Sequence, residues 1–254
     1  MMRKLISLAL CATLLVGVFA LAGCQSTDTD TLKVGMECGY PPFNWTQSTD
    51  ANGAVPIDGS KEFAGGYDVE IAKLLAEGTG KELVIVKTSW DGLAPAVQSG
   101  SIDAIIAGMS PTADRKQTID FSDPYYRSDL VVVVQKGSQW ENATTLEELA
   151  GTKITAQLNT FHYTVIDQIP NVEKKTAMDD FPAMRVALES GIIDGYVSER
   201  PEGVSATAAN AKFAMVEFAP DQGFQASDDD VAIAVGLKKG NTELAEGMNQ
   251  VIAD

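Results

Sequence analysis

The sequence predicts an α/β protein with two similar lobes. Short apolar strands alternate with amphipathic helices, a spacing typical of βαβ units and of mostly parallel sheets flanked by helices. The pattern restarts after the apolar run at 130–134, and a second apolar run at 231–235 can return the chain to the first lobe. Two such crossings form a two-segment hinge around a cleft. We expect lobe 1 at 32–134 plus 231–254, and lobe 2 at 135–230.

The first half of the chain carries one set of alternating elements. Its helices have apolar residues at helical spacing and end at glycines such as Gly78 and Gly100. Gly, Asp, Ser and Asn dominate 46–66, which is typical of a loop, and 118–126 contains the turn-like F-S-D-P-Y-Y. The predicted strands lie at 32–36, 83–86 and 102–107, and the helices at 67–78 and 93–98.

The second half repeats the alternation with shorter elements. Thr144 or Thr145 can cap a short helix, and Gly191 ends a longer one. The predicted strands lie at 154–156 and 192–197, and the helices at 146–150, 160–169, 183–190 and 244–252.

The amino-terminal segment is predicted to be a lipoprotein signal peptide. Two basic residues precede an apolar run at 5–21, and small residues then lead to Cys24. The run is short for a membrane-spanning helix, so we favour cleavage over a retained anchor. L-A-G-C at this point resembles the bacterial lipobox, in which the cysteine is acylated. We expect a signal peptide at 1–23, lipidation of Cys24 and a polar tether at 24–31.

Composition narrows the class of function. The chain has a net charge of −16, which argues against nucleic acid because phosphate binding needs a basic face. With Cys11 removed in the signal peptide and Cys24 acylated, Cys38 is the only remaining thiol, so no internal disulfide can form. His162 is the only histidine and is expected to be structural. The absence of a P-loop, a nucleophile elbow or a zinc-type Cys/His cluster predicts neither cofactor nor metal.

A strand–turn at 102–115 carries the clearest binding signal. The apolar strand ends at Gly108, and Ser110 and Arg115 follow within a few residues. Ligands of open α/β sheets lie at the carboxyl edge of the strands. An arginine there offers a planar fork that matches a carboxylate. We predict a subsite for the head group of a small carboxylic acid.

Aromatic and acidic residues follow other predicted strands of lobe 1. Glu37, Tyr40 and Trp45 lie in a proline-stiffened loop after the first strand, and Trp90 precedes a helix. Aromatic faces attract guanidinium or ammonium groups, and a nearby acid supplies the opposite charge. Trp45 and Trp90 can equally well belong to the core.

Two polar residues in lobe 2 also have two possible roles, one in ligand binding and one in the local structure. Thr160 begins a helix after a strand, where free N–H groups favour a carboxylate, but it can also be an ordinary N-cap. Glu199 lies at the carboxyl end of a strand and can accept from an ammonium group, or it can be a solvated acid paired with Arg200.

The chain resembles the polar amino-acid family of extracellular solute-binding proteins, the receptors of ABC importers. The resemblance runs from about residue 32 to 254 and rests on V-G-M-E-C-G-Y-P-P-F, F-A-G-G-Y-D-V-E-I-A, S-G-S-I-D-A-I-I-A-G-M-S-P-T-A-D-R and F-S-D-P-Y-Y. It implies a two-lobed type II periplasmic-binding fold that closes on one free amino acid. It also implies a monomer outside the cytoplasm, held at the outer face of a Gram-positive type membrane by the lipid alone, with a permease as partner.

The resemblance assigns a role to each head-group residue. Arg115 would grip the α-carboxylate, with the backbone amides of Ser110 and Thr160. Glu199 and the carbonyl of Gly108 would take the α-ammonium group. Many relatives have an aspartate at the position of Glu199, and a polar residue where this chain has Phe161.

The same resemblance assigns the side-chain subsite. Tyr40 and Trp90 would sandwich the side chain of the ligand, and Glu37 would face it. Together with Trp45 these residues suit arginine, then lysine, while glutamine or another polar amino acid stays open. A dehydratase-like enzyme on the same fold is the alternative of a different class, with Glu199 or His162 as its acid or base.

Overall fold

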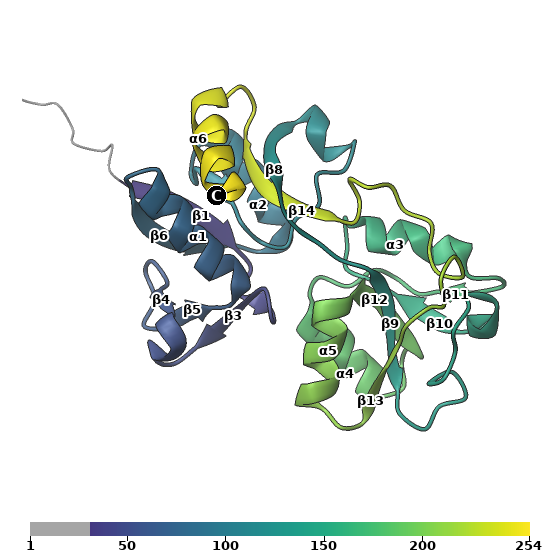
Figure 1. Ribbon diagram of the computed structural model, residues 1–254. Coiled ribbons are helices and arrows are strands. Elements are labelled where there is room, and N and C mark those ends of the chain that lie inside the picture. The colour runs from purple at the N-terminus through teal and green to yellow at the C-terminus, as the bar shows by residue number, and fades with distance from the viewer. Residues whose placement is uncertain (1–30) are drawn as a thin grey trace, which may run out of the picture. The chain divides into compact units, whose positions relative to one another are not determined.

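Residues 31–254, the part of the chain that the computed structural model describes, are organised around two five-stranded sheets (Figure 1). In the first sheet the strand order is β6-β1-β7-β14-β8. β1 is parallel to β7, with Val34 opposite Ala104, and β14 is antiparallel to both β7 and β8. The strands are β1 (Thr31–Met36), β6 (Glu82–Lys87), β7 (Ala104–Ile105), β8 (Ile119–Arg127) and β14 (Ala232–Lys238).

The second sheet has the order β11-β10-β12-β9-β13. β10 is parallel to β11 and β12, while β9 is antiparallel to β12 and β13. The strands are β9 (Leu130–Gln135), β10 (Lys153–Thr155), β11 (Glu173–Lys174), β12 (Gly195–Glu199) and β13 (Phe213–Val216). The chain passes between the two sheets twice, once from β8 to β9 and once from β13 to β14.

A small antiparallel sheet with the order β2-β3-β5-β4 follows β1. Its strands are short because prolines and glycines interrupt the segment. They are β2 (Gly39–Tyr40), β3 (Asn44–Gln47), β4 (Val55–Pro56) and β5 (Phe63–Gly65), and the 3-10 helix η1 (Ala51–Gly53) lies between β3 and β4.

Helices cover the sheets with their apolar faces. α1 and α6 pack against each other beside the first sheet, and α4 and α5 pack against strands of the second (Figure 1). The Asp180 side chain accepts a hydrogen bond of 2.8 Å from the amide of Ala183 and so caps α4. The helices are α1 (Tyr67–Gly78), α2 (Trp90–Ser99), α3 (Phe161–Val165), α4 (Phe181–Glu189), α5 (Arg200–Ala209), α6 (Thr242–Ala253), and the 3-10 turns η2 (Arg115–Gln117), η3 (Glu147–Leu149) and η4 (Ile166–Gln168).

The hydrophobic core consists of three clusters. One lies under the first sheet, one under the second, and the third joins Tyr40 and Phe43 to Phe181 and Tyr196. Each fully buried Val, Leu or Ile side chain contributes roughly 1.5–3 kcal/mol relative to an exposed one. The third cluster matters for function because it holds aromatic rings of β2 and α4 in contact.

The predicted fold class, an α/β fold with two sheets flanked by helices, is confirmed. The sheets were expected to be mostly parallel, and each combines parallel and antiparallel pairs. One prediction was wrong: residues 119–127 form the long strand β8 instead of a turn. Pro124 is tolerated there because the register between β8 and β14 shifts on both sides of its partner Ala234. The strand expected to end the first lobe, β9, pairs within the second sheet.

Helix α5 was not anticipated, because Pro201 and Gly203 interrupt the apolar pattern over its first turn. The signal peptide, the tether and Cys24 lie outside the described residues. Within 31–254, no helix has the length and apolarity needed to cross a bilayer.

Candidate functional site

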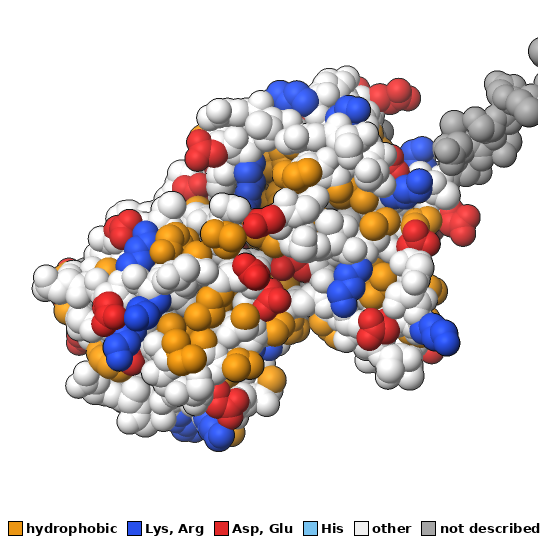
Figure 2. Space-filling view, turned by 180° about the vertical axis from the view of Figure 1, so that it is seen from behind, with side chains coloured by type: hydrophobic (Ala, Val, Ile, Leu, Met, Phe, Trp, Pro, Cys, Tyr) orange, Lys and Arg blue, Asp and Glu red, His pale blue; other side chains and the backbone are white. Residues whose placement is uncertain are grey.

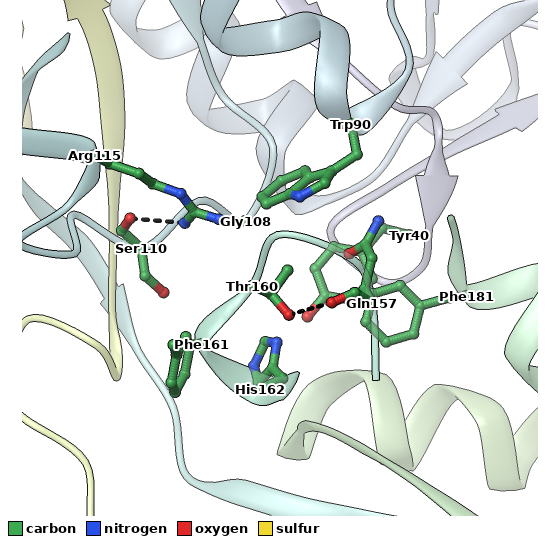
Figure 3. Close-up of a pocket in the computed structure, with 10 residues that line it drawn as sticks. All are labelled: Tyr40, Trp90, Gly108, Ser110, Arg115, Gln157, Thr160, Phe161, His162 and Phe181. Carbon is green, nitrogen blue, oxygen red and sulfur yellow. Dashed lines mark hydrogen bonds between the residues drawn. The ribbon is translucent and has the colours of Figure 1, made fainter. Parts of the chain in front are cut away.

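A small pocket is lined by residues that follow strands of both five-stranded sheets (Figure 3). Its lining residues are Tyr40, Trp90, Gly108, Ser110, Arg115, Gln157, Thr160, Phe161, His162 and Phe181.

Arg115 occupies one side of the pocket with a fixed orientation. Nη1 donates to the carbonyl of Ser110 at 2.9 Å, and Nη2 donates to the carbonyl of Asn159 at 3.0 Å. Its guanidinium lies over the ring of Trp90, 4.9 Å from the centroid (Figure 3). Burial lowers the pKa of Arg115 to about 10, so the group keeps its charge at neutral pH. With five N–H donors, Arg115 retains capacity for an anionic ligand.

Gly108 lets the backbone approach the aromatic wall. Its φ is +61°, and a Cβ at this position would lie 2.7 Å from Cε1 of Tyr40. Its amide also donates to the buried carboxylate of Asp68, which receives further bonds from Asn44 and Tyr125. Burial raises the pKa of Asp68 to about 6 against the effect of these bonds. The hydrogen bond to Asp68 therefore fixes the backbone of the turn after β7.

Tyr40 and Phe181 form the aromatic wall. Their rings stack with centroids 4.3 Å apart and an interplanar angle of 12°. Tyr40 also stacks on Phe43, at 5.0 Å. The hydroxyl of Tyr40 is buried and has no hydrogen-bond partner. A stacked ring pair from β2 and α4 thus forms an apolar part of the pocket lining, with one polar atom that has no partner.

Glu37 lies next to the pocket behind Gln157. Nε2 of Gln157 donates to Oε1 of Glu37 at 3.0 Å and to the carbonyl of Asp179, also at 3.0 Å. Burial raises the pKa of Glu37 to about 7, and its Oε2 has no partner. At neutral pH this carboxyl is populated in both protonation states, so it can donate or accept a hydrogen bond.

His162 and Glu199 form a buried pair at the base of the pocket. Nε2 of His162 lies 3.1 Å from Oε1 of Glu199, without the alignment of a hydrogen bond. Burial raises the pKa of Glu199 to about 8, with the Glu202 charge adding to the rise. Burial, and then the Arg115 charge, lower the pKa of His162 to about 3. At neutral pH the imidazole is therefore uncharged and the carboxyl is mostly protonated.

Unsatisfied polar atoms concentrate at this site. Of the eight buried side-chain polar atoms without a partner in 31–254, five belong to Glu37, Tyr40, His162 and Glu199. Each such atom costs about 1–3 kcal/mol, so a cluster of them indicates a place for a polar ligand or ordered water. Two larger grooves elsewhere lack this feature, since their charged side chains form ion pairs with each other, such as Lys239 with Asp120 and Arg200 with Glu217.

The structure brings together most of the residues singled out in the sequence. Six of the nine substrate-site positions line the pocket directly: Tyr40, Trp90, Gly108, Ser110, Arg115 and Thr160. Glu37 and Glu199 lie one contact away, through Gln157 and His162. Trp45 is not among the lining residues. Its Nε1 donates to Gln47 at 3.1 Å, and its ring packs close to Gly65 in the small sheet.

Four lining residues were not singled out as ligand contacts: Gln157, Phe161, His162 and Phe181. Gln157 lies two residues after the end of β10, so its position at the carboxyl edge of a strand was an available signal. Phe181 gave none, because an apolar residue at a helix start is equally typical of a core. His162 was assigned a structural role on its isolation in the sequence.

Charge and metal chemistry add two observations. Among the described residues, no group of three or more His, Cys, Asp or Glu side chains is placed to hold a metal ion. On the face seen in Figure 2, basic side chains are dispersed among acidic ones and do not gather into one patch.

Comparison with known proteins gives one family. The family model described as bacterial extracellular solute-binding proteins, family 3, matches residues 32–254. A probable histidine-binding protein of Campylobacter jejuni is 32% identical over 225 residues, covering 80% of this chain and 80% of that protein. The L-cystine-binding protein TcyJ of Escherichia coli (strain K12) is 30% identical over 251 residues, covering 98% of this chain and 86% of TcyJ.

The fold has counterparts among solved structures. The arginine-bound form of truncated ArgBP from T. maritima matches with a TM-score of 0.71 and 29% sequence identity. The match covers 88% of this chain and 95% of that chain.

Proposed function

Because the chain belongs to the bacterial extracellular solute-binding proteins of family 3, we propose that it captures one free amino acid in this pocket and delivers it to an ABC importer. The observation that carries the proposal is the pairing of a fixed cation with a buried, unsatisfied acid. Arg115 matches an α-carboxylate, and Glu199 matches an α-ammonium group. The amides of Ser110 and Thr160 and the carbonyl of Gly108 complete the head-group subsite.

We further propose that the ligand is a cationic amino acid, with arginine first. Glu37 has a carboxylate oxygen without a partner, and the aromatic rings of Tyr40 and Phe181 that line the pocket can contact a guanidinium group. Trp90 plays a different part from the sandwich expected, since Arg115 already lies over its ring. The arginine bound to the ArgBP of T. maritima supports this choice, and the histidine and cystine of the two named relatives define its competitors.

Glutamine is the second candidate, and one observation favours it. The pKa of Glu37 is raised to about 7 by burial, so much of this carboxyl is protonated at neutral pH. A protonated carboxyl donates a hydrogen bond to an amide carbonyl and gives little attraction to a cation. The charge state of Glu37 therefore decides between the two ligands.

Family membership removes the enzymatic alternative, because the family and both named relatives are described as binding proteins. The protein is an extracytoplasmic solute-binding protein. We propose that it acts as a monomer, anchored by a lipid on Cys24, with the lobes formed around the two five-stranded sheets closing on the ligand. The permease of the importer is its proposed partner.

Calorimetry of the chain from residue 25 onward against the twenty amino acids tests the proposal. We expect one or a few basic or polar amino acids to bind with micromolar or lower dissociation constants. Replacement of Glu37 by Gln should weaken arginine more than glutamine, because only the cation uses the charge. Failure of every amino acid to bind in the millimolar range would exclude amino-acid capture, and equal losses would exclude Glu37 from selecting the ligand.

A further inference from the structure

His162 is a buried imidazole whose nitrogens make no hydrogen bond within the protein. The residue is 5% exposed and lines the pocket, and both Nδ1 and Nε2 lack a partner. Figure 3 shows the ring rising from the start of α3 toward Thr160 and the pocket space. A histidine with a purely structural role would be expected to satisfy at least one nitrogen, because an unpaired buried donor costs about 1–3 kcal/mol.

Packing alone does not explain the choice of histidine. The ring of Phe161 lies beside it with centroids 4.3 Å apart, so an aromatic side chain of the same size would make the same contact. The neighbouring Glu199 is 2% exposed, and its Oε2 is also unpaired. His162 and Glu199 thus leave three polar atoms, Nδ1 and Nε2 of His162 and Oε2 of Glu199, available to one polar group of a ligand.

The charges around the pair favour a cation that brings its own proton donors. Arg115 repels a proton from His162, and Glu202 opposes ionisation of Glu199, although Arg185 already pairs with Glu202 at 2.7 Å. The imidazole therefore stays neutral and offers one nitrogen lone pair. An ammonium group has three N–H donors, so one N–H is left for a third acceptor when the Glu199 carboxylate and the Gly108 carbonyl accept one hydrogen bond each.

We propose that His162 contacts the ligand and accepts one hydrogen bond from its α-ammonium group, beside Glu199. This inference rests on the proposed function and adds a third acceptor to the ammonium subsite. The ammonium group then donates to the Gly108 carbonyl, to Glu199 and to a ring nitrogen of His162. Glu199 loses its proton to solvent as the ammonium group enters. The carboxylate and the ammonium group together then carry no net charge.

The test compares His162→Phe and His162→Gln with the unaltered protein, using L-arginine and its analogue without the α-amino group, δ-guanidinovaleric acid. A hydrogen bond to a charged group contributes about 1.5–3 kcal/mol, so His162→Phe should weaken arginine roughly 10- to 100-fold. It should leave the weaker binding of the analogue within about twofold. His162→Gln keeps an acceptor and should recover part of the loss.

Tyr163→Phe is the matched control on the same helix. It removes a hydroxyl that donates to the carbonyl of Lys175 outside the pocket, so arginine affinity should not change. Equal weakening of arginine and its analogue by His162→Phe, or no weakening of either, would overturn the role of His162. If neither arginine nor any other amino acid binds the unaltered protein, the proposed function fails first and this inference with it. Thermal melts show whether each variant is folded.

Discussion

Arg115 is held by two backbone carbonyls, from Ser110 and from Asn159, which lie on loops of different sheets. A lysine has one point charge and no planar fork, so it cannot make both bonds and also grip a carboxylate. Breaking a buried, hydrogen-bonded charge pair costs about 2–5 kcal/mol. We predict that Arg115→Lys weakens amino-acid binding at least about 30-fold in calorimetry.

The exposed Lys116→Ala gives a matched control, since its ammonium pairs with Asp229 away from the pocket. Its affinity should equal that of the unaltered protein. Retention of full affinity by Arg115→Lys would contradict the assignment of Arg115 as the carboxylate ligand.

The raised pKa of Glu199 predicts that ligand binding depends on pH. Its folded, ligand-free pKa is raised to about 8, chiefly by burial, and only the ionised form pairs with an ammonium group. Affinity should therefore rise by up to about tenfold per pH unit from about pH 6 to about pH 8 and then level off. Calorimetry across this range measures it. Glu199→Gln, which cannot ionise, should bind weakly and show only the smaller slope due to Glu37. A slope that survives unchanged in this variant would contradict the assignment.

At this scale the sequence identified residues whose role depends on their place after a strand. Arg115, Ser110 and Gly108 were found this way, because the end of an apolar strand is visible in one dimension. Phe181 and His162 were missed, because whether a helix-start residue faces a pocket depends on how distant elements pack. Trp45 was predicted to bind the ligand because of its aromatic ring, but it is not among the residues that line the pocket. It pairs with Gly65 within the small sheet.

Among the elements, the turn after β7 has a tight steric limit beside the pocket. Gly108 has φ +61°, and any Cβ would meet the ring of Tyr40. We predict that Gly108→Ala moves this ring, which is stacked on Phe181, and costs about 1–2 kcal/mol of stability from the positive φ alone. Amino-acid affinity should fall with it.

Denaturant unfolding and calorimetry together check this prediction. Gly59 also has a positive φ, of +69°, but nothing lies within 4 Å of its Cβ position, so Gly59→Ala isolates the backbone cost. It should lose similar stability and keep its affinity. If both variants bind equally well, the contact between Gly108 and Tyr40 does not shape the pocket.

Element prediction succeeded where periodicity was strong and failed where context overrode it. Helix α1 was predicted at its observed bounds, since its apolar face and glycine end are both local signals. Strand β8 was missed, because F-S-D-P-Y-Y is turn-like by composition and becomes a strand only through the bulged pairing with β14. The assignment of β9 to the second sheet is likewise a matter of pairing, which no single segment encodes.

For the whole molecule, we propose that the contacts which join the two halves of the pocket couple ligand binding to closure of the lobes. Nδ2 of Asn159 donates to Oδ1 of Asp91 at 2.9 Å, linking the loop after β10 to the first turn of α2. One such bond contributes about 0.5–1.5 kcal/mol. We predict that Asn159→Gly, which tolerates the native φ of +56°, lowers affinity about two- to tenfold by favouring the separated lobes.

Small-angle scattering of the ligand-free protein should show a larger average radius for Asn159→Gly, together with the weaker binding seen in calorimetry. Asp91→Ala removes the same bond from the other side and should have the same effect. The double variant should be no worse than either single one. Additive losses would contradict a direct bond between these two side chains.

The most direct test of amino-acid capture is a crystal structure of the chain from residue 25 onward with L-arginine. The account predicts one arginine in the pocket, with its α-carboxylate within about 3 Å of the Arg115 guanidinium and its α-ammonium group beside Glu199 and Nδ1 or Nε2 of His162. An arginine bound with its α-carboxylate away from Arg115, or bound only outside this pocket, would contradict the account.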